Sequence, residues 1–144
     1  MTETQKTQPV SLKSLLTPSK TVGIDFPGMD GFVVKLTYLA REELLKLRNR
    51  SVSQQFNKKT RSYEEQLDND KFLTEYCKAI IKGWSGLKYK YLEELLLVDV
   101  SKQDPNDELP WSQENAELMM KNSGDFDNWV SETVGDLENF TKSK

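Results

Sequence analysis

The sequence contains no histidine and one cysteine, Cys77, among its 144 residues. Without imidazole the chain cannot build a Ser-His-Asp or Cys-His nucleophilic pair, and no histidine can serve as a base near neutral pH. A single cysteine excludes an internal disulfide, a CxxC redox pair and a cysteine-rich zinc site. We therefore expect no catalytic residues, no metal and no cofactor. One cysteine is also compatible with a reducing compartment.

Long hydrophobic runs are missing as well. No stretch approaches the roughly 20 apolar residues of a membrane span, and the first residues lack the apolar segment of a signal peptide. From these absences we expect no membrane partner. We also expect that the protein acts in the cytoplasm in which it is made.

The residues that are present predict one globular domain with an uneven charge distribution. Hydrophobic residues make up 36% of the chain, and three Trp, five Tyr and six Phe supply bulk for a core. Residues 1–63 hold 11 Lys+Arg and 5 Asp+Glu, whereas residues 64–144 hold 9 and 18. This polarity favours head-to-tail contacts between copies or a charged partner. The simpler alternative is that both halves are solvated faces of one domain.

The pattern predicts an α+β, mainly α-helical fold with an N-terminal β-hairpin followed by about four to five helices. Residues 1–19 are expected to be a flexible segment and 20–141 a single domain, whose hairpin spans about 20–38 around the turn Pro27-Gly-Met-Asp-Gly31. Helical periodicity or helix-forming composition then predicts helices at about 40–50, 69–82, 91–97, 112–122 and 126–140.

Two segments between these elements have no clear apolar period. Residues 51–66 are polar, and we interpret them as a mobile connection that orders on binding. Gly83 is expected to end the helix before it in a left-handed conformation. In the last helix, Asp125 is expected to be the N-terminal cap.

Three groups of residues suggest chemistry, and a structural interpretation is favoured for each. Gly83-Trp-Ser-Gly86 has one residue too few for a Gly-x-Ser-x-Gly nucleophile elbow and follows a helix. Asp104, Asp107 and Glu108 lack the spacing of a calcium loop. Lys58, Lys59 and Arg61, flanked by Phe56 and Tyr63, combine basic and aromatic side chains as single-strand binders do, but the chain as a whole is acidic.

An ordered set of motifs in the C-terminal half resembles the tail assembly chaperones of long, flexible-tailed bacteriophages. These motifs are Ile80-Ile-Lys-Gly-Trp-Ser-Gly-Leu87, the helix start Ser112-Gln-Glu-Asn115, and a last helix ending in Asn139-Phe140. Each motif is common by itself, so their order carries the resemblance. It covers about residues 20–141 and includes the segment 32–44.

The resemblance implies a non-catalytic function in the host cytoplasm. Such chaperones bind and solubilise the aggregation-prone tape-measure protein, are displaced when the tail tube polymerises, and are not retained in the mature virion. In many of these phages a frameshift yields a longer form that contacts the tail-tube protein. This chain ends at Lys144, as the short form would, and no nucleic-acid partner is implied.

A chaperone for an amphipathic helix needs a groove that accepts apolar anchors at helical spacing. Trp84, Met120, Phe126 and Trp129 are the candidate partner-binding residues, and the alternative is that these side chains fill the core. Three other functions compete with the chaperone. They are a structural virion subunit for tail completion or connection, a nucleic-acid-binding regulator, and an enzyme that uses carboxylate chemistry alone.

Overall fold

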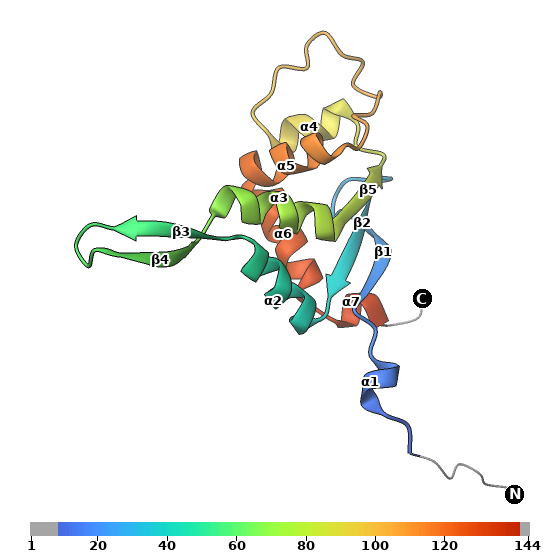
Figure 1. Cartoon of the computed structure of the whole chain (residues 1–144). Helices are drawn as coiled ribbons and strands as arrows, with labels where there is room; N and C mark the ends of the chain where they lie inside the picture. Colours follow the sequence, from blue (N-terminus) through green and yellow to red (C-terminus); the bar gives the residue numbers. More distant parts are fainter. Residues whose placement is uncertain (1–8, 142–144) are drawn as a thin grey trace, which may run out of the picture.

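A three-stranded antiparallel sheet with helices packed against it forms the body of the molecule (Figure 1). The structure is a computed structural model that describes residues 9–141. Strands β1 (Ser19–Asp25), β2 (Val33–Leu39) and β5 (Ile81–Ser85) lie in the order β1-β2-β5, so that β2 is central. β1 and β2 form the N-terminal hairpin predicted at about 20–38. Gly28 and Gly31 allow its turn, with φ of 81° and 84°.

Four longer helices build most of the rest of the body. They are α2 (Arg41–Arg50), α3 (Asn69–Ile80), α5 (Gln113–Asn122) and α6 (Gly124–Val134). Three short helices accompany them: α1 (Leu12–Leu15), α4 (Tyr89–Leu95) and α7 (Glu138–Thr141). No helix within residues 9–141 is both long and apolar enough to cross a membrane.

Serine and aspartate side chains cap the N-termini of three of the longer helices, α3, α5 and α6. The side chains of Asp68 and Ser112 accept hydrogen bonds from backbone N–H groups in the first turns of α3 and α5. The α6 helix is capped by Ser123, whose hydroxyl accepts from the N–H of Phe126 at 3.1 Å. The prediction that Asp125 caps this helix is therefore wrong, because the helix begins two residues earlier than expected, at Gly124.

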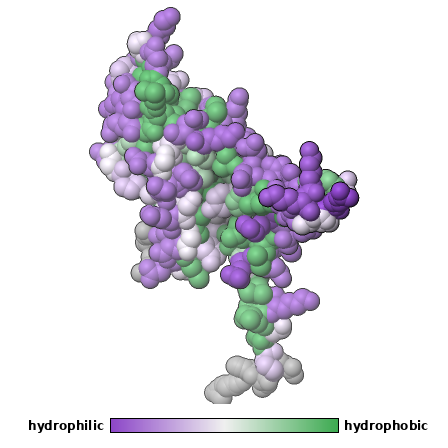
Figure 2. All heavy atoms as spheres, turned by 90° about the vertical axis from the view of Figure 1, so that its left-hand side faces the viewer, coloured by the Kyte–Doolittle hydropathy of each residue, from purple (hydrophilic) through white to green (hydrophobic). Residues whose placement is uncertain are grey.

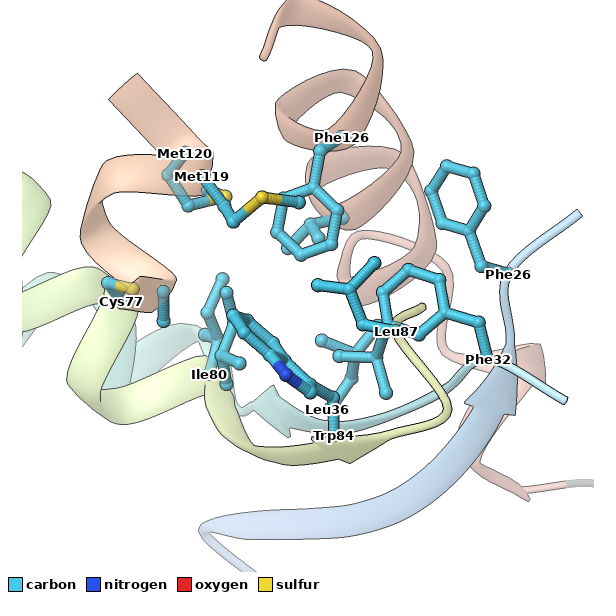
Figure 3. Close-up of a cluster of buried hydrophobic side chains, with 14 of the residues drawn as sticks. Phe26, Phe32, Leu36, Cys77, Ile80, Trp84, Leu87, Met119, Met120 and Phe126 are labelled. Carbon is cyan, nitrogen blue, oxygen red and sulfur yellow. The ribbon is translucent and has the colours of Figure 1, made fainter. Parts of the chain in front are cut away.

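The core lies between the sheet and helices α3, α5 and α6 (Figure 3). It combines aromatic and aliphatic side chains from strands and helices that are distant in sequence. The hydrophobic residues that are at most 1% exposed are Phe32, Val34, Leu36, Cys77, Ile80, Ile81, Leu87, Ala116, Met119, Phe126 and Val130. Phe140 of α7 packs beside Tyr38 of β2, with 5.6 Å between ring centroids, and joins the C-terminal helix to the sheet.

The predicted fold class, mainly helical with one hairpin followed by four to five helices, is wrong. The described residues form seven helices and five strands, and the strands make two sheets. The interval 51–66, expected to be an irregular connection, forms β3 (Val52–Asn57) and β4 (Ser62–Leu67). We call residues 52–67 the arm. Much of each strand of the arm is exposed, so the sequence lacks the apolar alternation of a half-buried strand.

Gly83 also differs from its prediction. The α3 helix ends at Ile80 and the chain continues directly into β5, where Gly83 pairs with Lys35 of β2. The left-handed glycine is Gly86, with φ of 77°. A Cβ atom at this position would meet the Gly31 carbonyl, so the β1–β2 turn and the end of β5 approach too closely for any side chain.

The segments predicted at the two ends of the chain agree only in part with the described structure. Of the flexible segment expected over residues 1–19, residues 1–8 lie outside the described residues, and Leu12–Leu15 form α1. The last helix, expected over 126–140, is divided into α6 and α7 near Gly135. Residues 142–144, at which the short form was expected to end, lie outside the described residues.

Candidate functional site

Three of the four candidate partner-binding residues belong to one aromatic cluster. Phe126 lies 6.3 Å from both Trp84 and Trp129, measured between ring centroids, and Phe26 lies 4.7 Å from Trp129. Phe32 completes the cluster at 5.4 Å from Phe26. These rings come from the β1–β2 turn, β5 and α6, so the cluster joins the hairpin to the C-terminal helices (Figure 3).

Burial of this cluster favours the alternative that its rings fill the core. Phe126 is fully buried, Trp84 is 9% exposed, and Trp129 is partly buried. The Trp84 indole N–H donates to the carbonyl oxygen of Leu109 at 3.0 Å, so its polar group already has a partner. In this conformation the cluster offers little surface to another protein.

Met120 differs from the other three candidates because it lines an open cleft. The cleft has a volume of about 440 Å³ and lies between helices α2 and α3 on one side and α5 and α6 on the other. We call it the leucine cleft. Its lining residues are Leu44, Leu45, Arg48, Phe72, Leu73, Tyr76, Met120, Asp127 and Ser131.

The lining of the leucine cleft is mostly apolar and part of it is open to solvent. Leu44 and Leu45 of α2 are 39% and 46% exposed. The rings of Phe72 and Tyr76, one turn apart on α3, stack with 5.4 Å between centroids. Leucine and stacked aromatic side chains give an apolar surface without directional hydrogen bonds, which suits partners of varied sequence.

Polar groups occupy part of the cleft wall. α2 contributes Arg48, and α6 contributes Asp127 and Ser131. Burial raises the pKa of the Tyr76 hydroxyl above its usual value, the negative charge of Asp127 adds to this effect, and a hydrogen bond with Ser131 opposes it. The Tyr76 hydroxyl therefore remains protonated at neutral pH. The cleft thus has a basic group on one wall and an acidic group on the other.

The leucines of α2 are the sequence feature that could have indicated the leucine cleft, but helical periodicity alone does not tell which of them are buried. In the helix predicted at about 40–50, helical spacing places Leu44, Leu45 and Leu47 on one apolar side, yet only Leu47 is buried, at 2% exposure. Two leucines beyond those needed to attach α2 are thus left at the surface. Figure 2, seen from the side of the arm, shows apolar surface among hydrophilic surface on this side of the molecule.

Glu108 and Cys77, two side chains that could carry chemistry, each make structural contacts. Glu108 accepts a hydrogen bond from the N–H of Gly86 at 2.9 Å, and no cluster of three or more metal-ligating side chains occurs within residues 9–141. Cys77 is fully buried, and burial raises the pKa of its thiol to about 12, with a further contribution from Glu117. Cys77 therefore stays a neutral thiol inside the core.

Comparison with known proteins places the chain in a phage family. A family model described as "YdaY prophage protein" matches residues 37–144. The chain belongs to the YdaY prophage protein family. The match begins in β2 and includes all four helices around the leucine cleft, so the cleft falls inside the part shared with the YdaY family. No curated protein and no solved structure matches the chain.

Proposed function

We propose that this YdaY-family protein is a non-catalytic tail assembly chaperone that binds an amphipathic helix of the tape-measure protein in the leucine cleft. The observation that carries the proposal is the cleft itself, which leaves Leu44 and Leu45 exposed beside stacked Phe72 and Tyr76. Membership of a prophage family agrees with a function in phage assembly. The motif resemblance in the C-terminal half supplies the class of partner.

The physical argument rests on the cost of leaving apolar surface in water. A long helical protein without its tube exposes apolar residues along one face and aggregates through them. A groove that takes apolar anchors at positions i, i+3, i+4 and i+7 covers such a face. Arg48 and Asp127 on the two walls match the charged residues that flank an apolar helical stripe.

Release must follow binding, because tube subunits replace the chaperone. The cleft is open to solvent on one side, so a bound helix would keep part of its surface accessible to the next partner. The proposed contact depends on a few apolar side chains and uses no covalent or metal-dependent step. Such a contact is suited to displacement rather than to permanent assembly. We therefore expect the protein in the cytoplasm of the host and not in the finished virion.

Co-expression with the tape-measure protein of the same phage tests the proposal. The wild-type chain should convert an insoluble tape-measure protein to a soluble complex, and the double variant Leu44→Gln/Leu45→Gln should fail to do so. The matched control is Leu118→Gln/Leu137→Gln, because these leucines are 48% and 51% exposed and lie outside the cleft. Equal solubilisation by both double variants would contradict a role for the cleft.

Composition of purified virions distinguishes the chaperone from a structural subunit. Quantitative mass spectrometry should detect the chain in lysates that contain unassembled tails and not in purified particles. A fixed number of copies in each virion would overturn the chaperone function in favour of a tail-completion or connector subunit.

A further inference from the structure

The arm projects from the body of the molecule as a separate two-stranded sheet (Figure 1). Its strands pair from Val52 with Leu67 to Asn57 with Ser62. The arm joins α2 to α3, so its base is fixed by two helices of the body. A lone two-stranded hairpin gains little stability from its own contacts. The strand edges of an exposed arm are open to contact with another chain.

The end of the arm combines exposed rings with unpaired basic groups. Phe56 and Tyr63 face each other across the strands, 5.3 Å apart between ring centroids, and are 52% and 70% exposed. Residues 57–63, which we call the arm tip, carry Lys58, Lys59 and Arg61 and no acidic residue, a net charge of +3. Within residues 9–141 none of these three side chains forms an ion pair.

The arm tip is held in one shape by its own hydrogen bonds. The Asn57 side-chain oxygen accepts from the N–H of Lys59 at 2.8 Å, and the Asn57 carbonyl accepts from the N–H of Arg61 at 2.7 Å. Arg61 has φ of 56°, in the left-handed region where glycine or asparagine costs less. A guanidinium group is therefore kept at the tip despite a local conformational cost, which points to a use for its charge.

A surface of opposite charge lies on a different side of the same chain. Residues 93–108, which we call the acidic lobe, form the end of α4 and the loop after it, at the top of Figure 1. The lobe holds six acidic residues and one lysine, a net charge of −5. All six carboxylate-bearing residues are exposed, and none forms an ion pair within the described part of the chain. Leu97 and Val98 in the lobe are also exposed.

The acidic lobe, like the arm tip, is shaped before any partner arrives. The N–H of Tyr89 donates to the Asp107 carbonyl at 2.9 Å, and the N–H of Leu109 donates to the Leu87 carbonyl at 2.8 Å. Hydrogen bonds from the hydroxyl and N–H of Ser101 lower the pKa of Asp99, which keeps its carboxylate ionised. Little ordering is then needed on contact, and less conformational entropy is lost.

We propose that the arm tip of one copy docks on the acidic lobe of a second copy, with Phe56 and Tyr63 against Leu97 and Val98. The charges, +3 and −5, are complementary, and both surfaces place apolar side chains beside the charged groups. In Figure 1 the arm and the lobe point away from the body in different directions, so one chain cannot bring its own two surfaces together. The contact is head-to-tail, and such contacts extend into rings or open chains. It does not depend on the proposed function.

Two charge-reversed variants test the contact. The arm variant is Lys58→Glu/Lys59→Glu/Arg61→Glu. The lobe variant is Glu93→Lys/Glu94→Lys/Asp107→Lys, chosen because these carboxylates form no hydrogen bond within residues 9–141, whereas Glu108 accepts from Gly86 and Asp104 from Asn106. Each variant carries the same sign on both surfaces and should be monomeric by analytical ultracentrifugation. An equimolar mixture pairs opposite signs again and should associate.

The wild-type protein should associate at about 0.05 M salt, with an affinity at least about tenfold lower at about 0.5 M salt. The matched control, Lys71→Glu/Lys78→Glu/Lys121→Glu, removes three exposed lysines outside the arm and should associate as the wild type does. Circular dichroism checks that every variant is folded.

Three results would overturn the proposal. The first is a wild-type chain that stays monomeric at millimolar concentration and low salt. The second is a mixture of the two variants that fails to associate while both remain folded. The third is a wild-type chain that binds a single-stranded oligonucleotide through the arm without associating, which would assign the arm to nucleic acid instead.

Discussion

The aromatic cluster around Phe126 and the leucine cleft beside it use the same kinds of side chain with opposite results. In the cluster, rings from the β1–β2 turn, β5 and α6 cover one another, and Phe126 has no exposed surface. In the cleft, Leu44 and Leu45 lie beside Phe72 and Tyr76, and no element among residues 9–141 covers them fully. Apolar content therefore does not distinguish a core from a binding surface in this chain. The apolar side chains form core where other helices, strands or turns pack over them, and they form a possible binding surface where they stay partly exposed.

The largest effect should come from opening the cluster. Phe126→Ala removes a fully buried ring and leaves a cavity between the hairpin and α6, so we expect the free energy of unfolding to fall by about 3–5 kcal/mol. Denaturant unfolding followed by tryptophan fluorescence measures this loss. A loss below about 1 kcal/mol would mean that the cluster is not the core.

The second largest effect should come from Gly86, where the end of β5 lies against the β1–β2 turn. Gly86→Ala places a Cβ against the Gly31 carbonyl in a left-handed conformation, and we expect it to cost more than about 2 kcal/mol of stability. Gly124→Ala is the matched control, because nothing lies within 4 Å of a Cβ there. Similar midpoints of thermal unfolding for the two variants would contradict the described packing.

Stability at high pH should report burial of the Cys77 thiol. In the unfolded chain the thiol loses its proton near its ordinary pKa of 9.0, whereas in the folded chain the pKa is raised to about 12. The folded state therefore binds more protons between these values, and its stability should fall as the pH rises from 9 to 12. The raised pKa of Tyr76 acts in the same direction. In Cys77→Ala this decline should be smaller, as measured by urea unfolding across that pH range, and an unchanged slope would contradict the burial.

The smallest effect on stability should come from the cleft. Leu44→Gln/Leu45→Gln replaces side chains that the fold leaves partly exposed, so we expect a change in unfolding free energy of about 1 kcal/mol or less. The same denaturant experiment used for Phe126→Ala provides the comparison. A loss near that of Phe126→Ala would show that these leucines belong to the core, and the distinction between cluster and cleft would fail.

The sequence patterns predicted those helices and strands that bury one face and leave the other exposed. The strands from Ser19 to Leu39 and the helix from Asn69 to Ile80 follow from their apolar periods and from glycine-rich turns or helix caps. The strands of the arm were not predicted from the sequence. They are largely exposed and have no apolar period, and their turn uses Arg61 in a conformation typical of glycine. Helical periodicity places Leu44 and Leu45 on an apolar side and does not show that both stay partly exposed within the described residues. Trp84, Phe126 and Trp129 were predicted from residue type, and only the packing distinguishes them from Met120.

Two adjacent methionines allow the most direct test of the proposed binding site. Met120 lines the leucine cleft, whereas Met119, next to it on α5, is 1% exposed and does not line the cleft. With ¹³C-labelled methionine methyl groups, titration with a helical segment of the tape-measure protein should shift the NMR signal of Met120 more strongly than that of Met119. Binding that leaves the Met120 signal unchanged, or that moves both signals equally, would contradict the claim that the cleft receives the helix.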